Sequence, residues 1–238
     1  ALVGIDGSYD DVNRLCSELS ELDEFESTAF VNVNLRPYYA EGSKTLGFEV
    51  AEQLGWRLPA QVVAPMASGS LLTKVHKAFH ELSAAGLVLQ SPWRIYGAQS
   101  AGCSPIATAF ENGWDVVRPV KPTGIAKSLN IGNPADGAYA LDAVRSTGGA
   151  MAQVTDDEIR AGIQLLARTT GVFAETAGGV TIAVLRKLSE SGALDTGQET
   201  VVYNTGDGLK TLEAVSDRAQ LTAVVPPTVK AIRAAGLL

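Results

Sequence analysis

Short apolar runs alternate along the chain with longer segments in which apolar residues recur every three or four positions. The run at residues 61–66 is almost continuously apolar, which is typical of strands buried on both faces of a sheet. By this criterion we expect strands at residues 2–6, 29–34, 61–66, 94–100, 150–154 and 199–204.

The longer segments carry helix signals. Leu46, Val50 and Leu54 stand four residues apart, on one helical face. Ser8 and Thr155 precede segments whose first turns are acidic, as expected of N-caps. We expect helices at residues 9–22, 41–56, 71–85, 105–112, 138–146, 156–168 and 181–191, and another after the paired prolines at 226–227, with a proline-containing loop at 113–135.

Strands that alternate with helices predict an α/β fold, with a mostly parallel sheet covered by helices on both faces. In such sheets ligands bind beyond the carboxyl ends of the strands. The loops that follow strands are therefore the places to search for chemistry.

Composition narrows the class of protein. The 238 residues carry 19 Lys and Arg against 26 Asp and Glu, a net charge of −7, and 46% are hydrophobic, an ordinary globular profile. Basic residues are scattered, so no nucleic-acid partner is expected. No apolar stretch approaches the ~20 residues that span a bilayer, and no signal peptide opens the chain. Two cysteines, Cys16 and Cys103, favour a reducing compartment, and we expect a cytoplasmic protein.

Two post-strand loops are candidates for ligand binding. Residues 65–70 (Pro-Met-Ala-Ser-Gly-Ser) offer small residues, two hydroxyls and a following helix N-terminus, which together suit an anion such as phosphate. Residues 205–210 (Thr-Gly-Asp-Gly-Leu-Lys) place Thr205 at a strand's carboxyl end, with glycines that let a ligand approach the backbone. Each loop is also compatible with a plain tight turn.

Three other patterns carry less weight. Residues 42–45 resemble the end of a nucleotide-binding P-loop, but Ser43 and Tyr38 occupy the places of its glycines. His76 and His80 share a helix face, but no third metal ligand is evident, so we expect a solvated face and no metal site. Cys103 is expected to be a buried bystander and not a nucleophile.

Taken in order, six segments resemble the threonine synthases, of the pyridoxal-phosphate fold type II family. Residues 7–11 are similar to G-N-[FY]-D-[DE], 39–45 to R-I-E-G-Q-K-T, and 64–70 to a segment with a G-N-x-G-N phosphate loop. Residues 130–134 contain I-G-N-P, 171–175 match G-[VI]-F-x-E, and 205–210 match T-G-x-G-L-K. The resemblance runs through nearly the whole chain.

The resemblance implies a fold like that of the tryptophan synthase β subunit and an enzyme that converts O-phosphohomoserine and water to threonine and phosphate. Pyridoxal 5′-phosphate would be the cofactor, serving as electron sink. Its phosphate would be held by Ala67, Ser68, Gly69, Ser70 and Leu71. Thr205 would hydrogen-bond the pyridine nitrogen, where a hydroxyl cannot hold a full pyridinium charge as a carboxylate can. The complete protein is expected to be a homodimer.

The family's Schiff-base lysine lies upstream of the segment that residues 7–11 resemble, and the six residues before that segment hold no lysine. The chain is therefore expected to be the carboxyl-terminal portion, incomplete at its N-terminus, without the catalytic lysine and inactive alone. Residues 1–35 would end a small mobile domain and residues 36–238 would form the second half of the large domain. Such a chain should leave core faces exposed.

Two alternatives remain. One is another fold type II enzyme, such as a threonine or serine dehydratase or a related synthase. The other is a non-catalytic half that binds a ligand or a partner.

Overall fold

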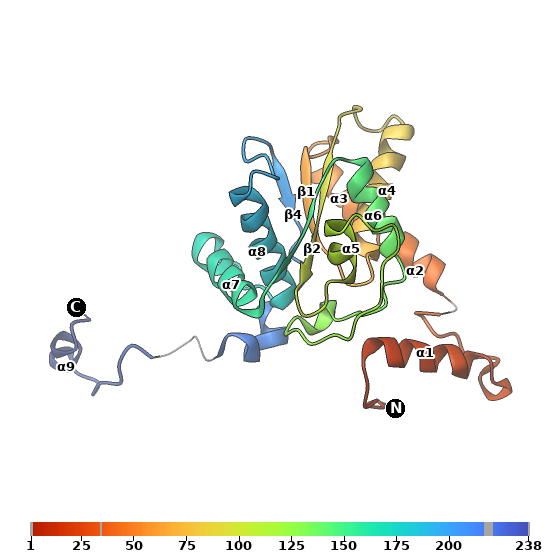
Figure 1. Ribbon diagram of the computed structural model, residues 1–238. Helices are drawn as coiled ribbons and strands as arrows, with labels where there is room; N and C mark the ends of the chain where they lie inside the picture. The colour runs from red at the N-terminus through yellow and green to blue at the C-terminus, as the bar shows by residue number, and fades with distance from the viewer. Residues whose placement is uncertain (1, 34, 217–220, 238) are drawn as a thin grey trace.

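A sheet of four parallel strands forms the centre of the protein (Figure 1). The computed structural model describes residues 2–33, 35–216 and 221–237, and all further statements concern these residues. The strands are β1 (Gln61–Pro65), β2 (Arg94–Ser100), β3 (Met151–Val154) and β4 (Thr200–Val202). Their order is β3-β2-β1-β4, so β1 pairs on both sides: Val63 lies opposite Tyr96 of β2 and Val202 of β4.

The described helices are α1 (Tyr9–Ser20), α2 (Arg36–Gly42), α3 (Thr45–Gln53), α4 (Ser70–Ala84), α5 (Pro105–Glu111), α6 (Gly137–Ser146), α7 (Asp156–Thr170), α8 (Thr176–Glu190) and α9 (Val229–Ala234). Helices α3 to α8 cover both faces of the sheet, as the sequence predicts (Figure 1). Three 3₁₀ turns, η1 (Asp23–Phe25), η2 (Lys127–Leu129) and η3 (Gly208–Ala214), lie in the connections.

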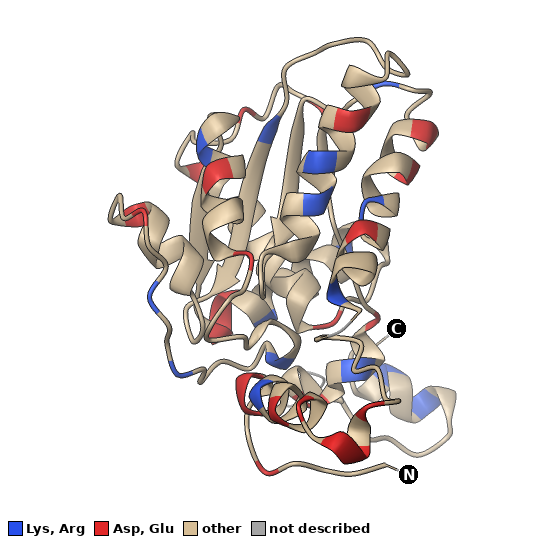
Figure 2. Cartoon of the chain, turned by 90° about the vertical axis from the view of Figure 1, so that its right-hand side faces the viewer, with Lys and Arg blue, Asp and Glu red and all other residues tan. Residues whose placement is uncertain are grey.

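Alternate residues of the strands face two separate cores. Val62 and Ala64 of β1 pack in a cluster with α3 to α6, whereas Val63 packs in a second cluster with α7 and α8. All five residues of β1 are buried, which explains the continuous apolar run in the sequence. Charged residues lie mainly on helices and loops, outside these cores (Figure 2).

Two expected strands are wrong. Residues 2–6 and the described part of 29–34 form no strand, and Asn34 lies outside the described residues. Leu2, Val3, Ile5 and Val31 are instead exposed. A strand needs a hydrogen-bonding neighbour, and the four described strands all lie between residues 61 and 202. Apolar composition alone therefore misled the prediction in this region.

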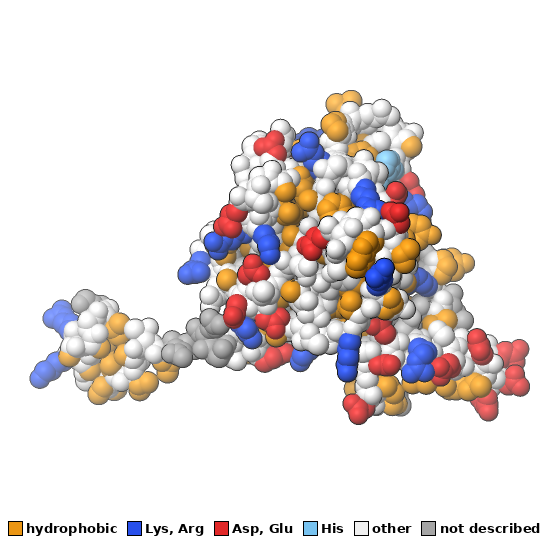
Figure 3. Space-filling view, viewed as in Figure 1, with side chains coloured by type: hydrophobic (Ala, Val, Ile, Leu, Met, Phe, Trp, Pro, Cys, Tyr) orange, Lys and Arg blue, Asp and Glu red, His pale blue; other side chains and the backbone are white. Residues whose placement is uncertain are grey.

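Large apolar side chains are exposed in the same region. None of the residues of α1 is buried, and several large apolar side chains between residues 2 and 39 are exposed. Figure 3 shows apolar atoms at the surface, around α1 and on other parts of this face.

Most predicted helices are confirmed, with two changes of boundary. The helix expected at 41–56 is two helices, α2 and α3, separated at Ser43 and Lys44. The helix expected from residue 181 begins at Thr176. The prediction started too late because Gly178 and Gly179, which lie inside α8, weaken the helical signal in the sequence. Ser8 and Thr155 cap α1 and α7 through complete capping boxes.

An ion-pair network joins α2 and α3 to α4. The carboxylate of Glu41 pairs with Lys44 at 2.8 Å, Lys77 at 2.7 Å and Lys74 at 3.1 Å, and Lys44 also pairs with Glu81. Hydrogen bonds from these lysines, that of Lys44 first, lower the pKa of Glu41 to about 2. The P-loop-like segment at residues 42–45 thus serves helix packing.

We predict that Gly179→Ala destabilises the protein. A Cβ on Gly179 would lie 2.6 Å from the carbonyl oxygen of Ile159 and 2.7 Å from Cγ1 of Ile163, so α7 and α8 would have to separate. The expected loss of unfolding free energy is about 1–3 kcal/mol, measured by urea denaturation. Gly42→Ala is the control, because its Cβ meets no atom within 4 Å. Equal effects at both positions would contradict the close packing of α7 on α8.

We predict a pH-dependent contribution from Glu41. Its folded pKa, about 2, lies below its ordinary 4.5, so its stabilising effect is complete above pH 4.5 and disappears as the pH falls through 2. The difference in melting temperature between the native protein and Glu41→Gln should therefore shrink over this window. Gln53→Ala, at an exposed and uncharged position of α3, is the control and should show no such trend. A difference independent of pH would contradict the network.

Candidate active site

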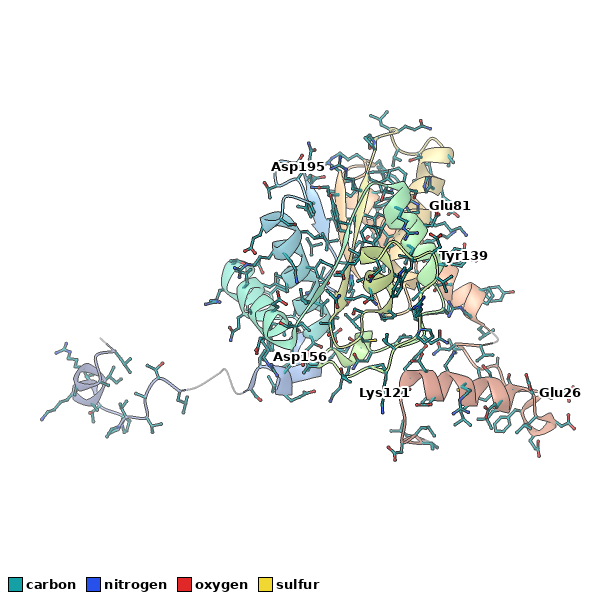
Figure 4. All side chains as sticks on the ribbon, viewed as in Figure 1. Glu26, Glu81, Lys121, Tyr139, Asp156 and Asp195 are labelled. Carbon is teal, nitrogen blue, oxygen red and sulfur yellow. The ribbon has the colours of Figure 1, made fainter. Side chains whose placement is uncertain are left out.

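A cavity opens where the chain leaves β1 and β4. Chain order runs from β1 through β2 to β3 on one side, while β4 pairs on the other side of β1. This divergence leaves a crevice at the carboxyl ends of β1 and β4, the place where parallel sheets bind ligands. Asp156, which follows β3, lies at the same end as Lys121 and α1, and Asp195, which precedes β4, lies at the opposite end (Figure 4).

The cavity has a volume of about 510 Å³. All six residues predicted to bind a cofactor line it, although they come from loops more than 130 residues apart: Ala67, Ser68, Gly69, Ser70, Leu71 and Thr205. The other four segments that carried the resemblance also reach the cavity, through Tyr9, Ser43, Ile131 and Glu175, and Lys210 reaches it from the same loop as Thr205.

The loop between β1 and α4 has the geometry of an anion cradle. Gly69 has a left-handed φ of 92°, and a Cβ there would lie 3.0 Å from the carbonyl oxygen of Asp136. Glycine at this position lets the chain turn directly into the 15-residue helix α4, whose first N–H groups have no partner within the helix. The hydroxyl of Ser70 is buried and has no hydrogen-bond partner among the described residues. The N–H of Ser70 donates to Ser68 Oγ at 3.3 Å. The wall therefore presents the unpaired hydroxyl of Ser70 and the positive end of a helix dipole.

The opposite wall is built from the residues after β4 and those before α8. The N–H of Glu175 donates to the carbonyl oxygen of Gly206 at 3.0 Å, which brings Thr205 to the cavity. The buried carboxylate of Glu175 accepts from Lys210 Nζ at 3.1 Å and from Ser128 Oγ at 3.4 Å. The glutamate thus joins three loops at one end of the cavity.

Helix α1 contributes a third wall. Tyr9, Asp10 and Asn13 line the cavity, and the carboxylate of Asp10 accepts from the N–H of Gly132 at 2.8 Å. Burial, with the neighbouring Tyr39 second, raises the pKa of Tyr9. The I-G-N-P loop is thus attached to α1 through its backbone.

Sequence reasoning missed Arg36 and Ser128 and assigned no role to Glu175 or Lys210. Arg36 pairs with Asp136 at 2.8 Å, and the N–H of Asp136 donates to the carbonyl oxygen of Ser68 at 3.0 Å. This connection spans 100 residues of sequence. Arg36-Pro37 and Asp136 carry no spacing signal that could have revealed it.

The cysteine and the histidines lie outside the cavity. Burial raises the pKa of Cys103 to about 11, so its thiol stays protonated at neutral pH. His76 is half-buried against Trp93 rather than solvated, and its Nδ1 accepts from Trp93 Nε1 at 3.3 Å. Burial lowers the pKa of His76 to about 4. No group of three or more metal-ligating side chains occurs in the described ranges.

The sequence of residues 1–206 matches the family described as pyridoxal-phosphate dependent enzyme. The chain belongs to this family, whose members depend on pyridoxal phosphate. Among solved structures it is similar to an L-serine ammonia-lyase from Rhizomucor miehei (TM-score 0.59, 18% identity, 76% of this chain and 56% of that one). A threonine deaminase from Solanum lycopersicum gives a TM-score of 0.56 at 20% identity, covering 76% of this chain and 50% of that one. The fold is therefore that of the fold type II enzymes.

Curated relatives of the chain include threonine synthases. That of Methanocaldococcus jannaschii is 34% identical over 90% of this chain and 52% of its own length. That of Methanosarcina acetivorans is 34% identical over 98% of this chain and 57% of its own length. The chain thus spans little more than half the length of these relatives.

The cavity fits the phosphate end of the cofactor. The hydroxyl of Ser70 is a buried donor without an acceptor, and the left-handed Gly69 places it beside the N-terminal end of α4.

Among the described residues, no helix is long and apolar enough to cross a membrane.

We predict opposite effects of Ser70→Ala on stability and on binding. The free energy of unfolding without ligand should stay constant or rise by up to ~1 kcal/mol, because an unsatisfied buried hydroxyl is removed. The affinity for pyridoxal 5′-phosphate, measured by equilibrium dialysis, should fall about tenfold, since a charge-assisted hydrogen bond is lost. Ser83→Ala is the matched control: its hydroxyl is also buried and unpartnered, but it lies outside the cavity. Equal affinities of the two variants would contradict the assignment.

Proposed function

We propose that the protein to which this chain belongs is a threonine synthase, which converts O-phospho-L-homoserine and water to L-threonine and phosphate. One observation carries the cofactor part: a phosphate cradle with an orphaned hydroxyl and the Thr205 loop line the same cavity at the switch point of the sheet. The threonine synthases matched along 90–98% of the chain support the choice of reaction.

In this proposal bound pyridoxal phosphate supplies an electron sink for carbanions at Cα and Cβ. Ala67 to Leu71 hold its phosphate through backbone N–H groups and the serine hydroxyls. Thr205 donates its hydroxyl to the pyridine nitrogen. Residues 1–35 end a small mobile domain, residues 36–238 belong to the large domain, and Tyr9 and Asn13 exclude water when α1 covers the cavity.

The pairing of charged side chains on the cavity wall leaves one place that suits an anionic ligand. Arg36 is paired with Asp136 and Lys210 with Glu175. Lys127 pairs with Glu213 at 3.4 Å, with both side chains largely exposed, so this pair adds little stability. Each basic side chain of the cavity thus already has a carboxylate partner. The cradle at Gly69 and Ser70 has none, so we assign the anionic group of the ligand to it.

The Schiff-base lysine is proposed to lie outside residues 1–238. Of the described lysines, Lys127 and Lys210 line the cavity, and each is paired with a carboxylate. A homodimer and a cytoplasmic location also stay predictions.

The test combines labelling with activity. The chain is incubated with pyridoxal phosphate and reduced with borohydride, and modified lysines are located by mass spectrometry. We expect no single lysine to be labelled stoichiometrically, and no release of phosphate from O-phosphohomoserine by the chain alone. A longer in-frame polypeptide that includes the chain should carry one labelled lysine and form threonine.

Stoichiometric labelling of one lysine within residues 1–238, lost in Thr205→Ala, would show that the chain has its own attachment site. Formation of a 2-oxo acid from threonine or serine, without phosphate release from O-phosphohomoserine, would replace the proposal with a dehydratase. No activity or labelling in any longer polypeptide would favour the non-catalytic alternative.

A further inference from the structure

The Thr205 end of the cavity holds the one charged side chain of the described residues that is fully buried. The side chain of Glu175 is 3% exposed, and its carboxylate accepts from Lys210 Nζ at 3.1 Å and from Ser128 Oγ at 3.4 Å. A buried carboxylate is costly unless it is paired and hydrogen-bonded. Lys210 reaches it with 60% of its own side chain exposed, so the lysine neutralises the carboxylate while remaining hydrated.

The same glutamate fixes the backbone beside Thr205. Its N–H donates to the carbonyl oxygen of Gly206 at 3.0 Å, and the neighbouring Ala174 forms a bridge with Asp207. A Cβ on Gly206 would overlap Oε1 of Glu175, so glycine is required for this close approach. Glu175 thus holds the backbone of Gly206, the residue next to Thr205.

The charges around this end cancel. Glu175 and Lys210 form a neutral pair, and the serine that completes the contact is uncharged. The other ionisable side chains that line the cavity are Arg36 (paired with Asp136), Lys127 (paired with Glu213), Asp10 (bound to backbone N–H groups), Tyr9 and Tyr39.

We propose that the Glu175–Lys210 ion pair positions Thr205 and keeps this end of the cavity electrically neutral, and so selects a cofactor ring whose nitrogen is unprotonated. The inference rests on the proposed function, since it places the ring nitrogen against Thr205. A hydroxyl can donate to a neutral nitrogen, whereas a carboxylate without its lysine would stabilise the positive pyridinium form. Glu175 is thus a positioning residue that acts through Thr205 and through its charge.

The probe is pyridoxine 5′-phosphate, which lacks the aldehyde and so binds without attachment to a lysine. The near-ultraviolet absorbance of its ring reports whether the ring nitrogen is protonated. Spectra of the bound probe are recorded against pH for the native chain, Lys210→Met, Glu175→Gln and the double variant. Lys187→Met is the matched control, because Lys187 pairs with Glu158 at 3.7 Å, is half exposed and lies outside the cavity.

Lys210→Met leaves an uncompensated carboxylate, so the pH at which the bound ring nitrogen loses its proton should rise by about one unit. Glu175→Gln leaves an uncompensated ammonium group, so this pH should fall. The double variant should return close to the native value, and Lys187→Met should not change it. If the ion pair had a purely structural role, the two single variants would not shift this pH in opposite directions, and the double variant would not restore it.

Three results would overturn the inference. Equal spectra in all variants, with the probe bound, would remove the electrostatic role and leave the proposed cofactor site intact. A loss of affinity in Glu175→Gln without a spectral shift would make the pair a structural contact only. Failure of the native chain to bind the probe would overturn both the cofactor site and this inference.

Discussion

The position of β1 is the constraint on which the site depends. The strand is hydrogen-bonded on both sides and buried on both faces. The chain therefore leaves β1 toward β2 on one side and approaches it as β4 from the other. The two loops that follow these strands diverge, and the cavity forms between them. A sheet with β1 at its edge would bring no second wall to the phosphate cradle.

Backbone geometry and charge pairing divide the cavity into two ends. At one end, Gly69 turns the chain into α4 and leaves donors without acceptors. At the other end, Glu175 and Lys210 cancel each other and hold the Thr205 loop. A ligand with an anionic group at one side and a neutral polar atom at the other matches this arrangement. Arg36 supports the first end, because the backbone N–H of its partner Asp136 donates to the carbonyl oxygen of Ser68.

Much of the fold was predictable from local pattern. The predicted segments at residues 61–66, 94–100 and 105–112 agree with β1, β2 and α5 to within one residue, because buried strands and capped helices leave short-range signals. The strands expected at 2–6 and 29–34 failed, since apolar residues there are exposed in the described structure. The start of α8 was also missed, because Gly178 and Gly179 weaken helix propensity, although Gly179 is needed where α8 packs on α7.

The sequence by itself determined the α/β class, the two loops that follow β1 and β4, and the family motifs, since each depends on neighbouring residues. Only the tertiary structure decided that Ser70 lacks a partner, that Arg36 is already paired, and that the carboxylate of Glu175 is buried and neutralised by Lys210. These properties depend on contacts between segments 35 to 100 residues apart. Burial and pairing set the energy of a charge, and the spacing of residues along the chain carries no information about either.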